Sequence, residues 1–148
     1  MKKLLLTLLV LLSARMGAQI TSENLGSKDM DGTRKVTVVL PDGYDKRQKY
    51  PLFVVLNASR LLEPTVTSLR YFARTGEVPP SIIVGIYNQE DDVTIPQETG
   101  VPFNDTAVFF EFVGQVVIPH VQSKYATNGF KGIIADGEGA NFINYYLL

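Results

Sequence analysis

The residues best placed to do chemistry form the turn at 135–139, Ala-Asp-Gly-Glu-Gly, between a short apolar run and the start of a predicted helix. A dinucleotide-binding turn, Gly-x-Gly-x-x-Gly, would need a third glycine where Phe142 stands, and the carboxylates of Asp136 and Glu138 would repel a phosphate. A nucleophile elbow, Gly-x-Ser-x-Gly, needs small residues at both ends and a serine at its centre. Both ends are small here, but the centre is Gly137, which has no hydroxyl. The turn therefore predicts elbow geometry without a nucleophile.

Other candidate residues support a catalytic or metal site less well. His120 is the single histidine and there is no cysteine, so we expect no zinc site. Residues 29–32, Asp-Met-Asp-Gly, match part of a calcium loop, but Val38 stands where its glutamate should be, which favours a plain turn. The acidic run 90–92 follows a predicted strand, where ligands of α/β proteins bind, and stays a binding candidate beside the commoner solvated loop. The two carboxylates within 135–139 could hold a small cation, but we expect neither a metal nor a cofactor.

Periodicity places this turn in an alternating series of strands and helices. The predicted strands are apolar or alternating runs bounded by Pro, Gly and polar residues: 34–40, 52–56, 81–87 and 132–135. The predicted helices carry apolar residues at helical spacing: 63–74, 106–125 (capped by Asp105, kinked at Pro119) and 140–148. Residues 22–31 are interpreted as a polar approach segment. The order predicts a three-layer α/β fold, with a mostly parallel sheet, helices on both faces, and the alternating strand 34–40 antiparallel at the sheet edge.

Six ordered segments carry a family resemblance: SENLG at 22–26, VTVVLPDGYD at 36–45, YPLFVVLNA at 50–58, VPPSIIVGIYN at 78–88, FFEFVGQVVIPHVQSKY at 109–125 and GIIADGEGANF at 132–142. In this order and spacing the chain resembles the Putative esterase family of the α/β-hydrolase superfamily. That family includes siderophore, feruloyl and S-formylglutathione esterases and mycolyltransferase-like members. The resemblance implies a three-layer α/β-hydrolase fold and spans nearly all of residues 19–148.

The departures from this family concern its catalytic residues. The resemblance implies a serine at the centre of the elbow, where this chain has Gly137. It also implies an acid and a histidine after the elbow, whereas His120 precedes it and the sequence stops at Leu148. Without nucleophile, acid and base, only the modest rate from binding and oxyanion stabilisation would remain. We therefore expect no catalytic residue, and a degenerate relative of the esterases.

The resemblance also implies where a ligand would bind. The oxyanion donors would be backbone N–H groups near Asn57 and Ala58 and at Glu138, with Asn88 lining the same cleft. The family often has Asp-Gly where Asn57-Ala58 stands. The acidic side chains of the turn would oppose a developing oxyanion. We expect an ester-like or acyl ligand to be bound there and not turned over.

Residues 1–18 predict a signal peptide, with a lysine-containing start, an apolar run and small residues before position 19. The apolar run is shorter than the about 20 residues that cross a bilayer, so no transmembrane span is expected after cleavage. The mildly acidic remainder offers no charge for binding nucleic acid. We expect export to the periplasm or the exterior.

Residues 19–148 are interpreted as the N-terminal portion of an esterase-like domain whose last strands are missing. Two alternatives stay open. In the first, the chain belongs to a genuine carboxylic-ester hydrolase whose remaining residues lie beyond Leu148. In the second, it is a non-catalytic interaction protein that uses its apolar C-terminal edge, at 142–148, as a contact. In either case a protein partner or a further segment would complete the sheet.

Overall fold

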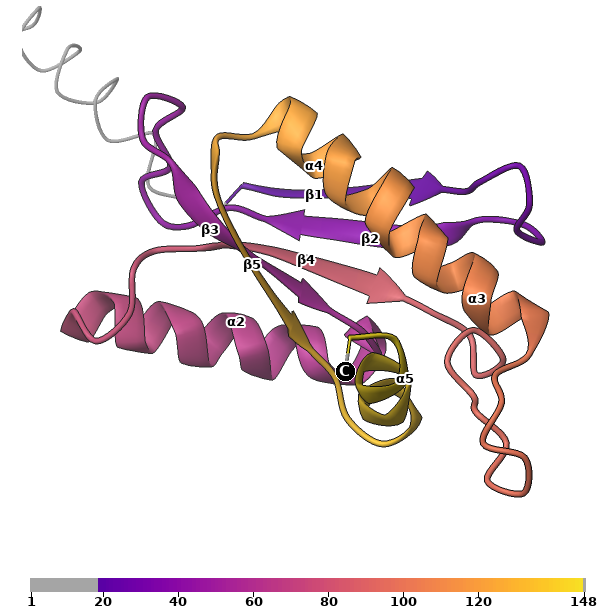
Figure 1. Ribbon diagram of the computed structural model, residues 1–148. Coiled ribbons are helices and arrows are strands. Elements are labelled where there is room, and N and C mark those ends of the chain that lie inside the picture. Colours follow the sequence, from indigo (N-terminus) through magenta and orange to yellow (C-terminus); the bar gives the residue numbers. More distant parts are fainter. Residues whose placement is uncertain (1–18, 148) are drawn as a thin grey trace, which may run out of the picture.

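The computed structural model describes residues 19–147; positions 1–18 and Leu148, and with them the predicted signal peptide, lie outside the described residues. The described chain begins with three consecutive strands, and from β3 onward strands alternate with helical segments (Figure 1). Their bounds are β1 (Ile20–Leu25), β2 (Arg34–Val39), β3 (Tyr50–Val55), α2 (Ala58–Thr75), β4 (Ile82–Tyr87), α3 (Asn104–Glu111), η1 (Phe112–Val117), α4 (Ile118–Lys124), β5 (Thr127–Ile134) and α5 (Glu138–Leu147).

The strands of residues 19–147 form one mixed sheet in the order β1-β2-β4-β3-β5. Strand β3 pairs in parallel with both β4 and β5, whereas β2 is antiparallel to β4 and to β1. The expectation of a mostly parallel sheet is therefore not confirmed. The three parallel strands β4, β3 and β5 are consecutive neighbours. Their carboxyl ends therefore lie along the same side of the sheet, which is called the carboxyl edge below.

The predicted position of the strand at 34–40 was wrong, although its antiparallel pairing was right. Strand β2 lies inside the sheet, and the edge is β1, within the segment interpreted as a polar approach. Ile20 pairs opposite Val39, and the Ser22 and Thr37 hydroxyls lie 2.8 Å apart across the two strands. Because β1 is an exposed edge strand, its side chains are mostly polar, and it lacks the apolar signal by which strands are recognised.

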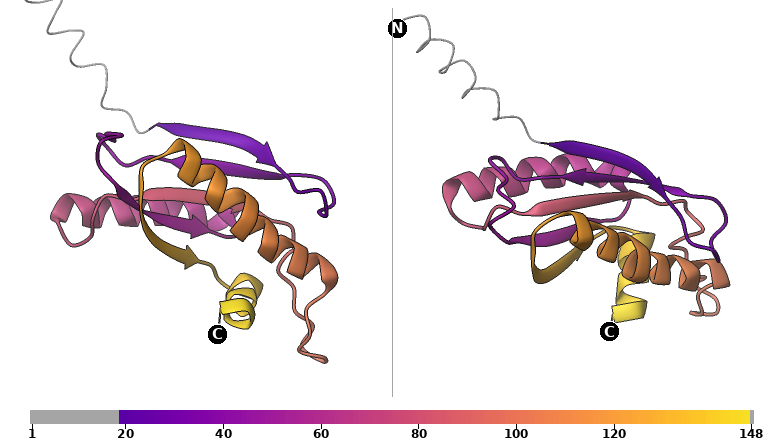
Figure 2. Two further views of the ribbon diagram at one scale, coloured as in Figure 1. Left: turned by 45° about the horizontal axis from the view of Figure 1, so that its top comes forward. Right: turned by 90° about the horizontal axis from the view of Figure 1, so that it is seen from above.

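Helices cover both faces of the sheet, as expected (Figures 1 and 2). Helix α2 packs alone on one face, where Leu62 and Ala58 contact β4. An added Cβ at Gly85 would lie 2.8 Å from the Leu62 side chain, so glycine allows α2 its close approach to β4. The other face is covered by α3, η1, α4 and α5. The buried core on this face includes Val36, Val38, Leu52, Val54, Ile82, Val84, Ile86, Phe109, Phe112, Val117, Val121 and Phe142.

The predicted helix at 106–125 is one helical rod that widens into π-helix at η1. Pro119 has no N–H to donate, and the widened turn lies directly before it. There the Ile118 N–H bonds the Val113 carbonyl, five residues back. Asp105 is not the cap: Phe103 occupies that position, and Asp105 lies in the first turn, where its charge favours the helix start.

Candidate functional site at the carboxyl edge of the sheet

The turn between β5 and α5 has the backbone geometry of an elbow. Gly137 at its centre has φ of +52°, in the left-handed region that side chains rarely adopt. An added Cβ there would meet no atom within 4 Å, so the position opens outward. At Gly139 an added Cβ would lie 3.1 Å from the Ala135 Cβ, which explains why the two ends of the turn are small. Strand and helix thus approach closely around an exposed central residue.

A second segment meets this turn at the end of β3. Asn57 also has a left-handed backbone, with φ of +53°, and it precedes α2 without capping it through its side chain. Its backbone N–H donates to the Asn88 Oδ1 at 2.7 Å, and its Nδ2 donates to the Asp136 Oδ1 at 3.4 Å. Asn88 follows β4 and Asp136 follows β5. The ends of three neighbouring parallel strands therefore meet in one polar network.

Arg60 completes this network and was not found by the sequence reasoning. It lies in the first turn of α2 and forms an ion pair with Asp136, which directly precedes the turn into α5. The Asp136 carboxylate is thus neutralised by Arg60 and hydrogen-bonded by Asn57, so it opposes an oxyanion less than the sequence suggested. The available signal was the spacing, since Arg60 follows Asn57 by one helical turn.

The family of the chain follows from the segments that build this edge. The Putative esterase family matches residues 27–136, which include β2, β3, β4, β5 and the helices between them. The chain belongs to the Putative esterase family. A structure of an uncharacterised protein from Capnocytophaga ochracea is 43% identical, with a TM-score of 0.81 over 86% of this chain and 36% of that one.

Solved structures of lower sequence identity share the fold of this chain. An IroE-like serine hydrolase from Shewanella oneidensis has a TM-score of 0.75 at 23% identity, covering 87% of this chain and 46% of that one. A ferulic acid esterase from Anaeromyces mucronatus has a TM-score of 0.66 at 21% identity, covering 86% and 53%. Endo-1,4-beta-xylanase Y of Acetivibrio thermocellus is 33% identical over 66% of this chain and 9% of its own length. The chain thus spans about half or less of these relatives.

Asn57 and Asn88, two of the four residues assigned to binding, are in direct contact at this end of the sheet. Asn57 and Asn88 are joined directly, which engages the Asn57 N–H that the resemblance assigns to an oxyanion. Ala58 is buried and packs in the core under α2. Glu138 begins α5, and its Oε2 is buried without a hydrogen-bond partner among residues 19–147. At the carboxyl edge, Asn57 and Asn88 thus bond each other, and the Glu138 Oε2 has no partner among the described residues.

His120 lies away from the elbow. Its Nε2 is 2.6 Å from the Glu23 Oε1 on β1, and Lys124 donates to the same carboxylate at 3.1 Å. The hydrogen bond from His120 is the largest cause that lowers the pKa of Glu23, against the opposing effect of burial. Strand β1 is one edge of the sheet and β5 the other, which are about 19 Å apart at ordinary strand spacing. In this chain His120 fastens α4 to β1.

Within the acidic run 90–92, the buried residue Asp92 has a structural role. Arg34 Nε and Nη2 each donate to an Asp92 carboxylate oxygen at 2.6 Å, and both side chains are buried. The hydrogen bond to Asp92 is also the main cause that raises the pKa of Arg34. Asp92 Oδ2 further accepts the Gln89 N–H at 2.7 Å. The pair therefore fixes the loop that carries Asn88 into the candidate site.

The described residues contain no group of three or more His, Asp or Glu side chains placed to bind a metal ion together. In the loop at 29–32, the Asp31 carbonyl accepts a hydrogen bond from Arg34 Nη1 at 3.0 Å. Within residues 19–147, no helix combines the length and the apolar character that a membrane span requires.

Proposed function

We propose that this chain is an exported, catalytically inactive member of the esterase family, and that its carboxyl-edge site binds an ester-like or acyl ligand without hydrolysing it. The main observation behind the proposal is Gly137. It occupies the exposed, left-handed centre of an elbow, the position from which a serine would attack a carbonyl. A glycine there leaves the surrounding turn intact and supplies no nucleophile.

Two further observations support inactivity. The Asn57 N–H, which the family resemblance assigns to oxyanion stabilisation, is already bonded to Asn88. The single histidine of the sequence is paired with Glu23 beside the opposite edge strand. Within residues 19–147, a hydroxyl placed at position 137 would therefore have neither a histidine base to remove its proton nor an unoccupied Asn57 donor to stabilise the product charge.

The site still offers groups that can hold an ester. Asn88 Nδ2, which bonds the Gln89 carbonyl through one of its two N–H groups, and the backbone N–H groups that begin α5 can donate to a carbonyl oxygen, and the space over Gly137 is open. Binding of p-nitrophenyl butyrate should therefore shift the amide resonances of Asn57, Asn88 and Gly137 in NMR spectra, with no release of p-nitrophenol. Shifts elsewhere in the protein and none at this edge would contradict a binding role.

The test of inactivity compares the wild-type protein with Gly137→Ser. Gly76→Ser is the matched control, because Gly76 also has a positive φ and open space around an added Cβ. All three proteins should resist labelling by a fluorophosphonate probe and should hydrolyse p-nitrophenyl esters at the background rate. A nucleophile with a working base adds at least about a hundredfold in rate. Labelling of the wild type, or a gain of that size in Gly137→Ser alone, would show a functional hydrolase.

Export is proposed from the pattern of residues 1–18 alone. The intact mass of the native protein tests it, because signal removal leaves a chain that begins near position 19. A mass that includes residues 1–18 would contradict export through a cleaved signal.

A further inference from the structure

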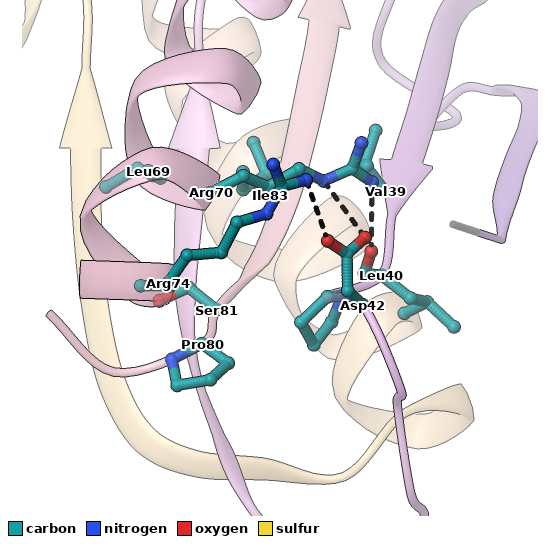
Figure 3. Close-up of a pocket in the computed structure, with 11 residues that line it drawn as sticks. Val39, Leu40, Asp42, Leu69, Arg70, Arg74, Pro80, Ser81 and Ile83 are labelled. Carbon is teal, nitrogen blue, oxygen red and sulfur yellow. Dashed lines mark hydrogen bonds and ion pairs between the residues drawn. The ribbon is translucent and has the colours of Figure 1, made fainter. Parts of the chain in front are cut away.

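A pocket of about 140 Å³ lies at the other end of the sheet from the elbow, between the C-terminal half of α2 and the sheet (Figure 3). Val39 and Ile83 line it and are paired across β2 and β4, at the start of β4. The carboxyl end of β4, which leads to Asn88, is the opposite end of that strand. At ordinary strand rise the two sites are about 17 Å apart, so the pocket is separate from the site proposed above.

The inner wall of the pocket is apolar and its rim is charged. The apolar residues that line it include Val39, Leu69, Ala73, Pro80 and Ile83. Arg70 and Arg74 are one helical turn apart on α2, and both point to the Asp42 carboxylate (Figure 3). Two guanidinium groups thus face one carboxylate, and the rim keeps a net positive charge.

The pairing at this rim is incomplete. The Arg70 Nε is buried and has no hydrogen-bond partner among residues 19–147, because its nearest carboxylate oxygen, Asp42 Oδ1, is 3.7 Å away. That is beyond the range of an N–H···O hydrogen bond. The other contact of Arg70, from Nη2 to the Leu40 carbonyl, is long at 3.4 Å. Buried donors without partners are rare in folded proteins, and an absent anion or water is a usual reason for them.

Asp42 is the residue of this rim that an incoming ligand can displace from Arg70. Its side chain is 51% exposed, whereas that of Arg70 is 24% exposed. Arg74, at 72% exposure, holds Asp42 by one bond of 3.2 Å. A carboxylate entering from solvent could bond Arg70 Nε and Nη2 side by side, the geometry in which arginine binds carboxylates most strongly. Its apolar part would then lie against the inner wall.

We propose that this pocket binds a small monocarboxylate whose apolar body is about the size of a benzene ring. A cavity of about 150 Å³ with apolar walls accommodates benzene, so the size matches. The carboxylate satisfies the Arg70 donor and displaces Asp42 from it. The positive charge of the rim selects a carboxylate head group, and the apolar inner wall selects the ring or other apolar part of the ligand.

The test titrates the full chain with benzoate, benzamide and acetate and measures binding by calorimetry and by NMR shifts. Benzamide has the shape of benzoate without its charge, and acetate has the charge without the ring. Benzoate should bind at least about tenfold more tightly than either, since a hydrogen-bonded charge and a buried ring each contribute that much. Equal binding of benzamide would refute the charge selection, and equal binding of acetate the apolar selection.

Two variants locate the binding. Arg70→Gln should weaken benzoate at least about tenfold. Asp42→Asn should strengthen it about fivefold, because a repelling charge about 4 Å from the ligand is removed. Asp42 is half-exposed, so this variant should fold whether or not Arg70→Gln does. Unchanged or weakened binding in Asp42→Asn, or shifts that centre on Asn57 in place of Ile83, would overturn the proposal and leave the ester site untouched.

Discussion

Loss of the Asp92 carboxylate should destabilise this protein more than loss of any neighbouring acid. In Asp92→Ala the Arg34 guanidinium, whose side chain is 7% exposed, would lose two hydrogen bonds of 2.6 Å and its counter-charge. Removing one partner of a buried ion pair costs about 3–5 kcal/mol, mainly because the other charge stays buried. Asp91→Ala is the matched control: Asp91 is exposed, and its removal should cost no more than about 0.5 kcal/mol.

Urea unfolding of the two variants measures these costs. A double variant, Arg34→Met with Asp92→Leu, should recover most of the stability, because an apolar pair leaves no buried charge. The losses of the single variants Arg34→Met and Asp92→Leu should together exceed the loss of the double variant by about 3 kcal/mol or more. A loss below about 1 kcal/mol in Asp92→Ala would refute the reasoning, since it would mean that water reaches Arg34.

The same variant has an expected effect on the candidate site. Asp92 accepts the Gln89 N–H, and the preceding residue, Asn88, accepts the Asn57 N–H at 2.7 Å. Loosening of this loop should therefore speed hydrogen exchange at the Asn57 amide in Asp92→Ala. Exchange as slow as in the wild type would show that Asn88 is held by the end of β4 alone.

Three further changes test other parts of the structure. The pKa of Glu23 is lowered in the folded state, so its pairing with His120 stabilises the protein above the ordinary glutamate pKa of 4.5 and is lost as the pH falls through the lower folded value. Glu23→Gln should therefore remove about 0.5 kcal/mol of this acid-sensitive stability, and urea midpoints with the same pH dependence in both proteins would contradict it. Gly139→Val should cost about 1–3 kcal/mol, because its Cβ would crowd Ala135 at 3.1 Å; an unchanged unfolding midpoint would count against the close approach. Gly137→Ser should cost only about 1 kcal/mol, from the left-handed backbone, and a loss as large as that of Gly139→Val would indicate a crowded site.

The fold could be predicted where the signal was local and apolar. The runs at 52–56 and 81–87 correspond to β3 and β4, since β-branched runs of that length form strands covered on both faces. The boundaries were less accurate for α2, which starts at Ala58, five residues before the predicted helix. Its first turn contains the polar Ser59 and Arg60, which are exposed and carry no core signal, although Arg60 pairs with Asp136.

Strand β1 could not be predicted in the same way. An edge strand pairs on one side only and leaves much of its surface in water, so polar side chains are tolerated there. Its place in the sheet depends on hydrogen bonds to β2, such as those that set Ile20 opposite Val39. The sequence of residues 20–25 does not carry that information by itself.

The absence of a nucleophile at the centre of the elbow is evident from the sequence. Gly137, in a turn with small ends at Ala135 and Gly139 after an apolar strand, indicates the turn and leaves out the hydroxyl, and both properties are local. The residues that surround the turn, in contrast, are set by the tertiary structure. Asn57 and Asp136 are 79 positions apart, and Arg34 and Asp92 are 58 apart. Such contacts arise because the strand order brings the carboxyl ends of β3, β4 and β5, and the start of the antiparallel strand β2, to the same side of the sheet. No local propensity encodes which strand ends become neighbours.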